Sequence, residues 1–204
     1  TGYGIDTTEC DDLCRVLDAE GLDRFHLLGH SSGGALAFAL ARRLPDRVRR
    51  MVLVEPTLFG IMAEPARGDI RATFRSFAET GEKRGDRAGL AHAIDWLGGE
   101  AWQRLGPDRQ AARLDAMMPM AHLVIPHFRA LAGFPITPED VRGVTVPTLL
   151  VYGAQTYPME FDIAAAFRAL RPDWPQHIID GAGHNCFRDK AAEANAAIRR
   201  FLSE

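Results

Sequence analysis

The sequence lacks several features that would assign it to a special class of protein. Its 204 residues include only three cysteines, an odd count that argues against a disulfide framework and for a reducing compartment, so we expect a cytoplasmic protein. No apolar run reaches the roughly 18 residues of a membrane span, and no block of about five basic residues indicates nucleic-acid binding. We therefore expect neither a membrane nor a nucleic acid as partner, and a homo-oligomer is left open.

The sequence also lacks cysteines and histidines at the spacing of a metal site. Cys10 and Cys14 share one face of an expected helix, but no second pair of ligands accompanies them. Cys186, two residues after His184, is interpreted as a small packing residue. We therefore expect neither a metal nor a cofactor.

The chain has enough apolar material for a sizeable core. Hydrophobic residues make up 47% of it, and the formal net charge is −3, which favours no charged partner. The length fits a single domain that carries an insertion.

One stretch organises the rest of the chain. Residues 25–28 are largely apolar, the sequence Gly29-His30-Ser31-Ser32-Gly33 follows, and an alanine-rich helix is expected over 32–44. This is the G-x-S-x-G pattern of a nucleophile elbow, in which a serine stands on a sharp turn between a strand and a helix. Ser31 is therefore the candidate nucleophile. The N–H of Ser32, at the start of the helix, is a candidate oxyanion donor.

Together with Gly181-Ala182-Gly183-His184 and the opening Gly2-Tyr3-Gly4, the residues from Gly29 to Gly34 resemble the α/β-hydrolase superfamily. The resemblance covers most of the chain. It implies the fold and two catalytic residues, but it does not identify a substrate, because this fold hosts many chemistries.

The start of the chain departs from this resemblance. In such hydrolases a turn like Gly2-Tyr3-Gly4 follows several strands and the loop with the second oxyanion donor. The resemblance thus implies a chain without its N-terminal strands, and with the second oxyanion donor in the missing segment.

The order of expected elements predicts an α/β fold with a mostly parallel sheet flanked by helices. Strand, helix and strand follow one another up to residue 54, and the sheet resumes at 146–153. The core is assigned to 1–56 and 142–204, and the helical stretch 57–141 to an inserted cap. The other expected helices are 70–80, 87–97, 107–118, 121–131, a short one from 137, 161–170 and 190–202, and the last strand is 176–179.

His184 is the candidate base for Ser31, because it lies in a loop after the last strand and follows the serine along the chain. The resemblance places the acid three residues after the glycine that ends strand 146–153, but Thr156 stands there. Some hydrolases of this superfamily carry the acid at the end of the strand after the nucleophile helix, so the resemblance implies Glu55, which stands there, as the replacement. Asp162 or Glu160 is the alternative, and the absence of a working acid is another.

The cap segment carries apolar side chains that can form its own core or a substrate pocket, and Trp96 and Met118 are chosen as substrate-binding candidates, together with His30 beside the nucleophile. The full apolar set is Phe59, Met62, Phe74, Phe77, Trp96, Trp102, Met117, Met118, Met120, Phe128 and Phe134.

The sequence thus predicts a serine hydrolase that acts on a small molecule, with a carboxylic ester as the default substrate. Carbon–carbon bond hydrolysis and haloperoxidase-like activity use the same serine and histidine within the superfamily. A non-catalytic ligand-binding relative is the alternative of another class, favoured by Thr156.

Overall fold

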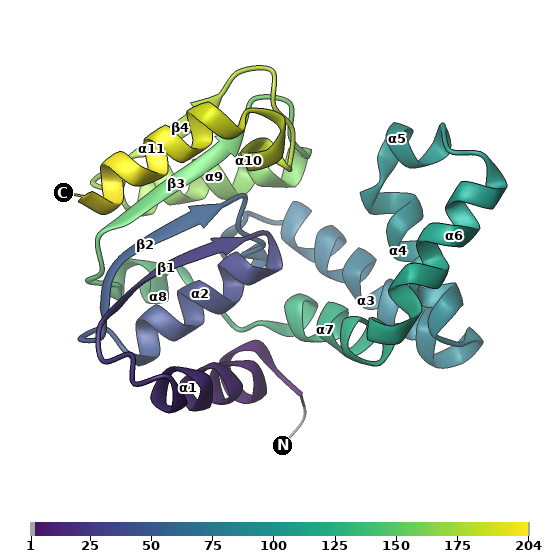
Figure 1. Cartoon of the computed structure of the whole chain (residues 1–204), viewed down its shortest axis with the longest axis horizontal. Coiled ribbons are helices and arrows are strands. Elements are labelled where there is room, and N and C mark those ends of the chain that lie inside the picture. Colours follow the sequence, from purple (N-terminus) through teal and green to yellow (C-terminus); the bar gives the residue numbers. More distant parts are fainter. Residues whose placement is uncertain (1–2, 204) are drawn as a thin grey trace. The chain divides into compact units, whose positions relative to one another are not determined.

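The computed structural model describes residues 3–203, apart from the side chains of residues 100 and 101 (Figure 1). Thr1, Gly2 and Glu204, which belong to the predicted turn and core, lie outside the described residues. Among residues 3–203, none of the helices combines the length and apolarity that a membrane span requires.

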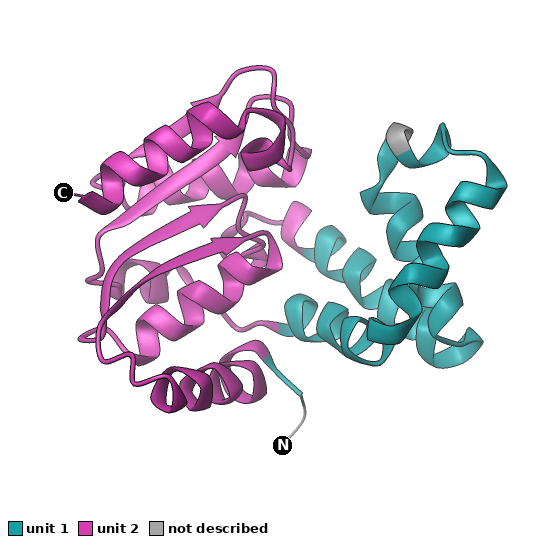
Figure 2. Cartoon of the chain, in the orientation of Figure 1, with its two compact units in different colours: residues 1–4, 68–133 teal, residues 5–67, 134–204 magenta. Residues whose placement is uncertain are grey.

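The chain forms two compact units (Figure 2). The sheet unit consists of residues 5–67 and 134–204, and the helical unit consists of residues 68–133 with Tyr3 and Gly4. The predicted cap, 57–141, contains the whole of 68–133. That this segment covers the site stays a prediction.

A parallel sheet forms the centre of the sheet unit. Its strands are β1 (Phe25–His30), β2 (Val48–Val54), β3 (Thr148–Gly153) and β4 (Gln176–Ile179), in that spatial order. All three strand pairs are parallel, as predicted. Successive parallel strands need crossover connections, and the chain supplies helices for them.

Helices cover the sheet on both faces. Ala194, Ile198 and Phe201 of α11 pack into one apolar cluster with Val54 and Val151, and α9 lies on the opposite face of β3 (Figure 1). The helices of this unit are a π-helical turn (Ile5–Glu9), α1 (Cys10–Ala19), α2 (Ser32–Arg43), a 3-10 turn (Phe59–Ile61), α8 (Pro138–Gly143), α9 (Pro158–Leu170), α10 (Cys186–Asp189) and α11 (Ala191–Ser203).

The register brings the carboxyl ends of the strands to one edge. His30 pairs with Val54, and Val54 pairs with Val151. The residues that directly follow β1 and β2, Ser31 and Glu55, therefore emerge at the same edge of the sheet, where parallel α/β folds place their sites.

The helical unit has its own aromatic core. The ring of Phe77 lies 5.4 Å from the rings of both Phe74 and Phe128, and 6.2 Å from that of Trp96. Within the described residues no strand interrupts 57–141, as the sequence predicts. The helices are α3 (Ala66–Arg84), α4 (Asp86–Leu97), α5 (Gly99–Gln103), α6 (Pro107–Met117), a 3-10 turn (Met118–Met120) and α7 (Ala121–Gly133).

Several predicted helix ends differ from the observed ones, since α3 begins at Ala66 instead of residue 70 and α9 at Pro158 instead of residue 161. The helix expected to stop at Thr80 continues through Gly81 to Arg84. A Cβ on Gly81 would lie 2.9 Å from the Ile125 side chain of α7, so this glycine permits close helix packing instead of ending the helix.

Candidate active site

Ser31 stands on a strained turn between β1 and α2. Its backbone has φ 53° and ψ −123°, a region that non-glycine residues rarely adopt. A Cβ on Gly29 would lie 2.7 Å from the carbonyl carbon of Gly33, so the turn closes only over a glycine. The local backbone has the form that the elbow pattern predicts.

Hydrogen bonds hold this turn in place. The Ser31 N–H donates to the carbonyl of Val54 at 2.9 Å, and the Ser31 carbonyl accepts from the N–H groups of Gly34 and Thr57 at 2.8 and 3.1 Å. These bonds offset backbone strain that costs on the order of 1–3 kcal/mol. The serine is thereby held at the edge of the sheet.

The Ser31 hydroxyl contacts a threonine. Its Oγ lies 3.4 Å from Thr57 Oγ1, and among the described hydrogen bonds none joins Ser31 Oγ to His184. Bonds between a nucleophile and its base are often loose in the absence of substrate and tighten when substrate binds. Ser32 is the first residue of α2, so its N–H has no carbonyl of a preceding helical turn to bond.

Glu55 is a fully buried carboxylate with three hydrogen-bond donors. It directly follows β2 with φ 51°. Its Oε1 accepts from the Gly153 N–H at 2.6 Å, and its Oε2 accepts from the Thr156 hydroxyl and from His184 Nδ1, the latter at 3.2 Å. Donors of this kind favour the ionised form of a carboxyl group.

Thr156 therefore has a definite place in the site. The sequence shows only that this residue replaces the usual aspartate, whereas the structure shows its hydroxyl donating to Glu55. Of the two alternative acids, Asp162 lies on an exposed part of α9, and Glu160 is fully buried with Oε1 4.0 Å from His184 Nδ1. Glu160 is thus a second buried carboxyl group near His184, in addition to Glu55.

His184 lies in the loop after β4, and its carbonyl accepts a hydrogen bond from His30 Nε2 at 3.0 Å. The two imidazole centroids are 4.8 Å apart, and the ring of Tyr157 lies 5.0 Å from that of His184. Burial lowers the pKa of His30. The hydrogen bond from His30 Nε2 to the His184 carbonyl ties the His184 loop to the end of β1. A role for His30 in substrate binding stays a prediction.

Trp96 and Met118 belong to the helical unit. Trp96 packs on Phe74 with ring centroids 6.0 Å apart, and Met118 lies in the 3-10 turn after α6. That Trp96 and Met118 contact the substrate stays a prediction.

One cluster of potential metal ligands occurs among the described residues, formed by Glu55, Glu160 and His184 with ligand atoms within 4.8 Å of one another. His184 Nδ1 already has Glu55 as its hydrogen-bond partner. The buried Cys186 has a pKa raised by burial to about 11, which agrees with its predicted packing role.

A family comparison decides the chain's affiliation. A profile of the alpha/beta hydrolase family matches residues 1–197. The chain belongs to the α/β-hydrolase family. Its sheet order, its elbow and the loop of His184 are the parts of that fold that this α/β-hydrolase displays.

Individual relatives are more distant. The chain is 28% identical over 198 residues to a 2-hydroxy-6-oxononadienedioate/2-hydroxy-6-oxononatrienedioate hydrolase of Cupriavidus pinatubonensis, covering 92% of this chain and 65% of that protein. It is 27% identical over 195 residues to carboxylesterase YbfK of Bacillus subtilis, covering 92% and 60%. The chain thus spans less than two thirds of the length of these relatives.

Among solved structures, MenH from S. aureus is similar with a TM-score of 0.76 and 20% identity, covering all of this chain and 76% of that one. At this identity the likeness shows the fold alone.

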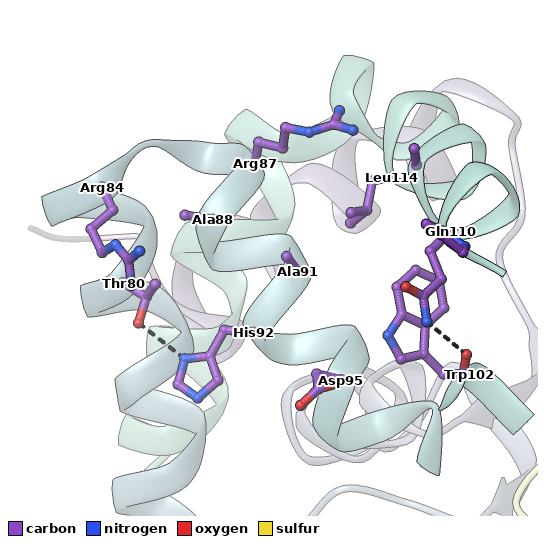
Figure 3. A pocket seen from close by; sticks show the side chains of 12 residues that line it. Thr80, Arg84, Arg87, Ala88, Ala91, His92, Asp95, Trp102, Gln110 and Leu114 are labelled. Carbon is purple, nitrogen blue, oxygen red and sulfur yellow. Dashed lines mark hydrogen bonds between the residues drawn. The ribbon is translucent and has the colours of Figure 1, made fainter. Parts of the chain in front are cut away.

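A separate pocket of about 730 Å³ lies within the helical unit of this α/β-hydrolase (Figure 3). Its lining comes from α3, α4, α5 and α6, with His92 bonded to Thr80 at 3.0 Å and Gln110 Nε2 donating to the Trp102 carbonyl at 3.0 Å. Neither Ser31, Glu55 nor His184 lines it.

Sequence reasoning missed Thr57 and the supporting role of Thr156. Both are common polar residues without a motif of their own. The only signal was their position, since each follows the end of a sheet strand by three residues, at the edge where Ser31 and Glu55 emerge.

Proposed function

We propose that this α/β-hydrolase is a serine hydrolase that forms an acyl-enzyme on Ser31. The observation that carries the proposal is the 3.2 Å hydrogen bond between His184 Nδ1 and Oε2 of the buried Glu55. Glu55 emerges at the same edge of the sheet as the strained Ser31 turn. A carboxylate on one imidazole nitrogen orients the ring and stabilises the imidazolium that forms when the other nitrogen takes a proton.

The proposed reaction has two halves. Ser31 Oγ attacks the substrate carbonyl carbon while His184 Nε2 takes the hydroxyl proton, and the Ser32 N–H donates to the resulting oxyanion. The tetrahedral intermediate then collapses, the bond to the leaving group breaks, and His184 returns the proton to that group. Water repeats the sequence on the acyl-enzyme and releases the acid.

A carboxylic ester is the proposed substrate. An alkoxide leaving group needs only the proton that His184 has just received, so the residues of the site suffice for the reaction. The similarity to carboxylesterase YbfK supports this substrate class. The Thr156 replacement, which favoured a non-catalytic relative, now has an explanation in its hydrogen bond to Glu55.

Hydrolysis of a carbon–carbon bond is the second candidate. The relative from Cupriavidus is named for 2-hydroxy-6-oxo dienoic and trienoic diacids, which carry a ketone and neither an ester nor an amide. Hydrolysis of such a compound must break a carbon–carbon bond next to the ketone. The same Ser31 and His184 serve either reaction.

The test is intact-mass spectrometry after treatment with a fluorophosphonate, a probe that reacts with activated serines. We expect one adduct on the parent protein and none on Ser31→Ala. Ser32→Ala is the matched control, because it removes the neighbouring hydroxyl and keeps the backbone N–H, and it should label. Failure of the folded parent to label would reject the serine-hydrolase proposal in favour of a ligand-binding protein.

Substrate class is then decided by turnover. A set of p-nitrophenyl esters and a 2-hydroxy-6-oxo dienoate are compared as substrates of the unlabelled parent enzyme. Preference for the dienoate in kcat/KM would replace the ester proposal by the second candidate.

A further inference from the structure

Glu160 is a buried carboxyl group that the proposed reaction does not use. It lies in the first turn of α9 and is fully buried. Within the part of the chain that the structure describes, neither of its carboxyl oxygens has a hydrogen-bond partner. An unpaired polar group in such a place costs free energy, so its presence needs a reason.

Its neighbour is Glu55, and the two carboxyls differ in one respect. Glu55 accepts bonds from Gly153, Thr156 and His184, whereas Glu160 has no donor. Two adjacent buried carboxylates repel each other, and donors stabilise the charge of the one they contact. The lack of donors and the nearness of Glu55 therefore favour the protonated form of Glu160. Burial and the charge of Glu55 raise the pKa of Glu160 well above its ordinary value.

The other titratable groups around the pair agree with a single negative charge. Tyr152 of β3 and Tyr157 before α9 both have a pKa raised chiefly by burial, so both stay neutral. Arg168 of α9 acts on Tyr152 only as a minor influence. Among these groups His184 is the one that gains a positive charge during the proposed reaction.

We propose that Glu160 is a positioning residue for His184: it holds the proton of a Glu55–Glu160 pair, and it supplies the anion for His184 when Glu55 cannot. Its Oε1 already lies 4.0 Å from His184 Nδ1, within about one ångström of hydrogen-bond distance. This inference rests on the proposed function, in which His184 is the base.

The first test measures the proton itself. The side-chain carboxyl carbons of glutamate are labelled with ¹³C, the Glu160 signal is assigned by its loss in Glu160→Gln, and its pH titration is followed by NMR. We expect Glu160 to stay protonated where exposed glutamates have ionised, and its pKa to fall in Glu55→Gln, which removes the neighbouring charge. Titration of Glu160 together with the exposed glutamates, or no change in Glu55→Gln, would overturn the inference.

The second test is a double-mutant cycle in kcat/KM. Glu55→Gln should lose about 10- to 100-fold, because Glu160 replaces it, and Glu55→Gln/Glu160→Gln should lose about 10⁴-fold, the cost of removing such a carboxylate entirely. The residual activity of Glu55→Gln should rise with pH as Glu160 ionises, and the double variant should lack this rise. Multiplicative effects of the two substitutions would contradict the proposal.

Controls separate the possible failures. Glu20→Gln, at an exposed site, should leave the effect of Glu55→Gln unchanged in the same cycle. If the double variant does not fold, the carboxyl titration of the parent and Glu55→Gln decides the question. An unlabelled Ser31 would reject the proposed function alone, because the carboxyl titration does not depend on turnover.

Discussion

At the scale of single residues, the backbone is strained directly after both β1 and β2. Ser31 and Glu55 have φ of 53° and 51°, and each is the first residue after a strand. The two side chains leave the sheet at this edge because the backbone turns sharply at the point where strand pairing ends. Strain of this kind persists only where surrounding contacts fix it, as the hydrogen bonds to Ser31 do.

The elbow glycines should differ in their tolerance of a side chain. Gly29→Ala would bring a Cβ to 2.7 Å from the Gly33 carbonyl carbon, whereas a Cβ on Gly33 would meet no atom within 4 Å. We expect Gly29→Ala to lower the free energy of unfolding by about 1–3 kcal/mol and to slow fluorophosphonate labelling. Gly33→Ala should be neutral or stabilising by up to about 1 kcal/mol, because it removes a glycine from a helix.

Urea denaturation of the two variants measures this difference. Equal losses for Gly29→Ala and Gly33→Ala would show that the close approach at Gly29 is not what constrains the turn.

At the scale of elements, the first turn of α9 places the Glu160 carboxyl group in the interior of the sheet unit. Glu160 is fully buried there, and its pKa is raised by burial and by Glu55. Between the ordinary glutamate value of 4.5 and the raised one, the folded protein holds a proton that the unfolded chain has lost. Stability therefore falls as pH rises through this window.

Glu160→Gln should remove this dependence. The free energy of unfolding of the variant minus that of the parent should increase with pH above about 4.5, by up to about 1.4 kcal/mol per pH unit for one proton. Chemical denaturation at several pH values measures it, with the exposed Glu20→Gln as control. A difference that stays constant with pH would mean that Glu160 ionises normally in the folded protein.

At the scale of the whole molecule, the two compact units have separate cores. The site residues Ser31, Glu55 and His184 all belong to the sheet unit, while the aromatic rings around Phe77 belong to the helical unit. Separate cores allow local unfolding of one unit while the other keeps its hydrogen bonds.

Phe77→Ala should unfold the helical unit selectively. Phe77 is fully buried, and truncation of such a side chain costs about 3–5 kcal/mol. In hydrogen exchange followed by mass spectrometry, amides of α3, α4 and α7 should exchange faster, while β2 and β3 keep their protection. Phe161→Ala, at an exposed phenylalanine, is the control. Equal loss of protection in the strands would show that the chain unfolds as one unit.

Much of the fold could be predicted from local pattern. The four strands, the parallel arrangement and most helices follow from apolar periodicity and glycine or proline boundaries. Very short helices such as α5 and α10 were missed, because four or five residues are too few to show a period. The extension of α3 past Gly81 was missed because it depends on a side chain of α7, distant in the sequence.

The sequence by itself determined the elbow at Ser31, the position of His184 after the last strand, and Glu55 as the expected replacement for an acid at Thr156. These follow from short motifs and from where strands end. Only the tertiary structure decided that Thr156 donates to Glu55, that Thr57 contacts Ser31, and that a second carboxyl, Glu160, is buried beside them. The physical reason is that these contacts join residues up to about 100 positions apart in the sequence. Such residues meet only when parallel strands bring their carboxyl ends to one edge of the sheet.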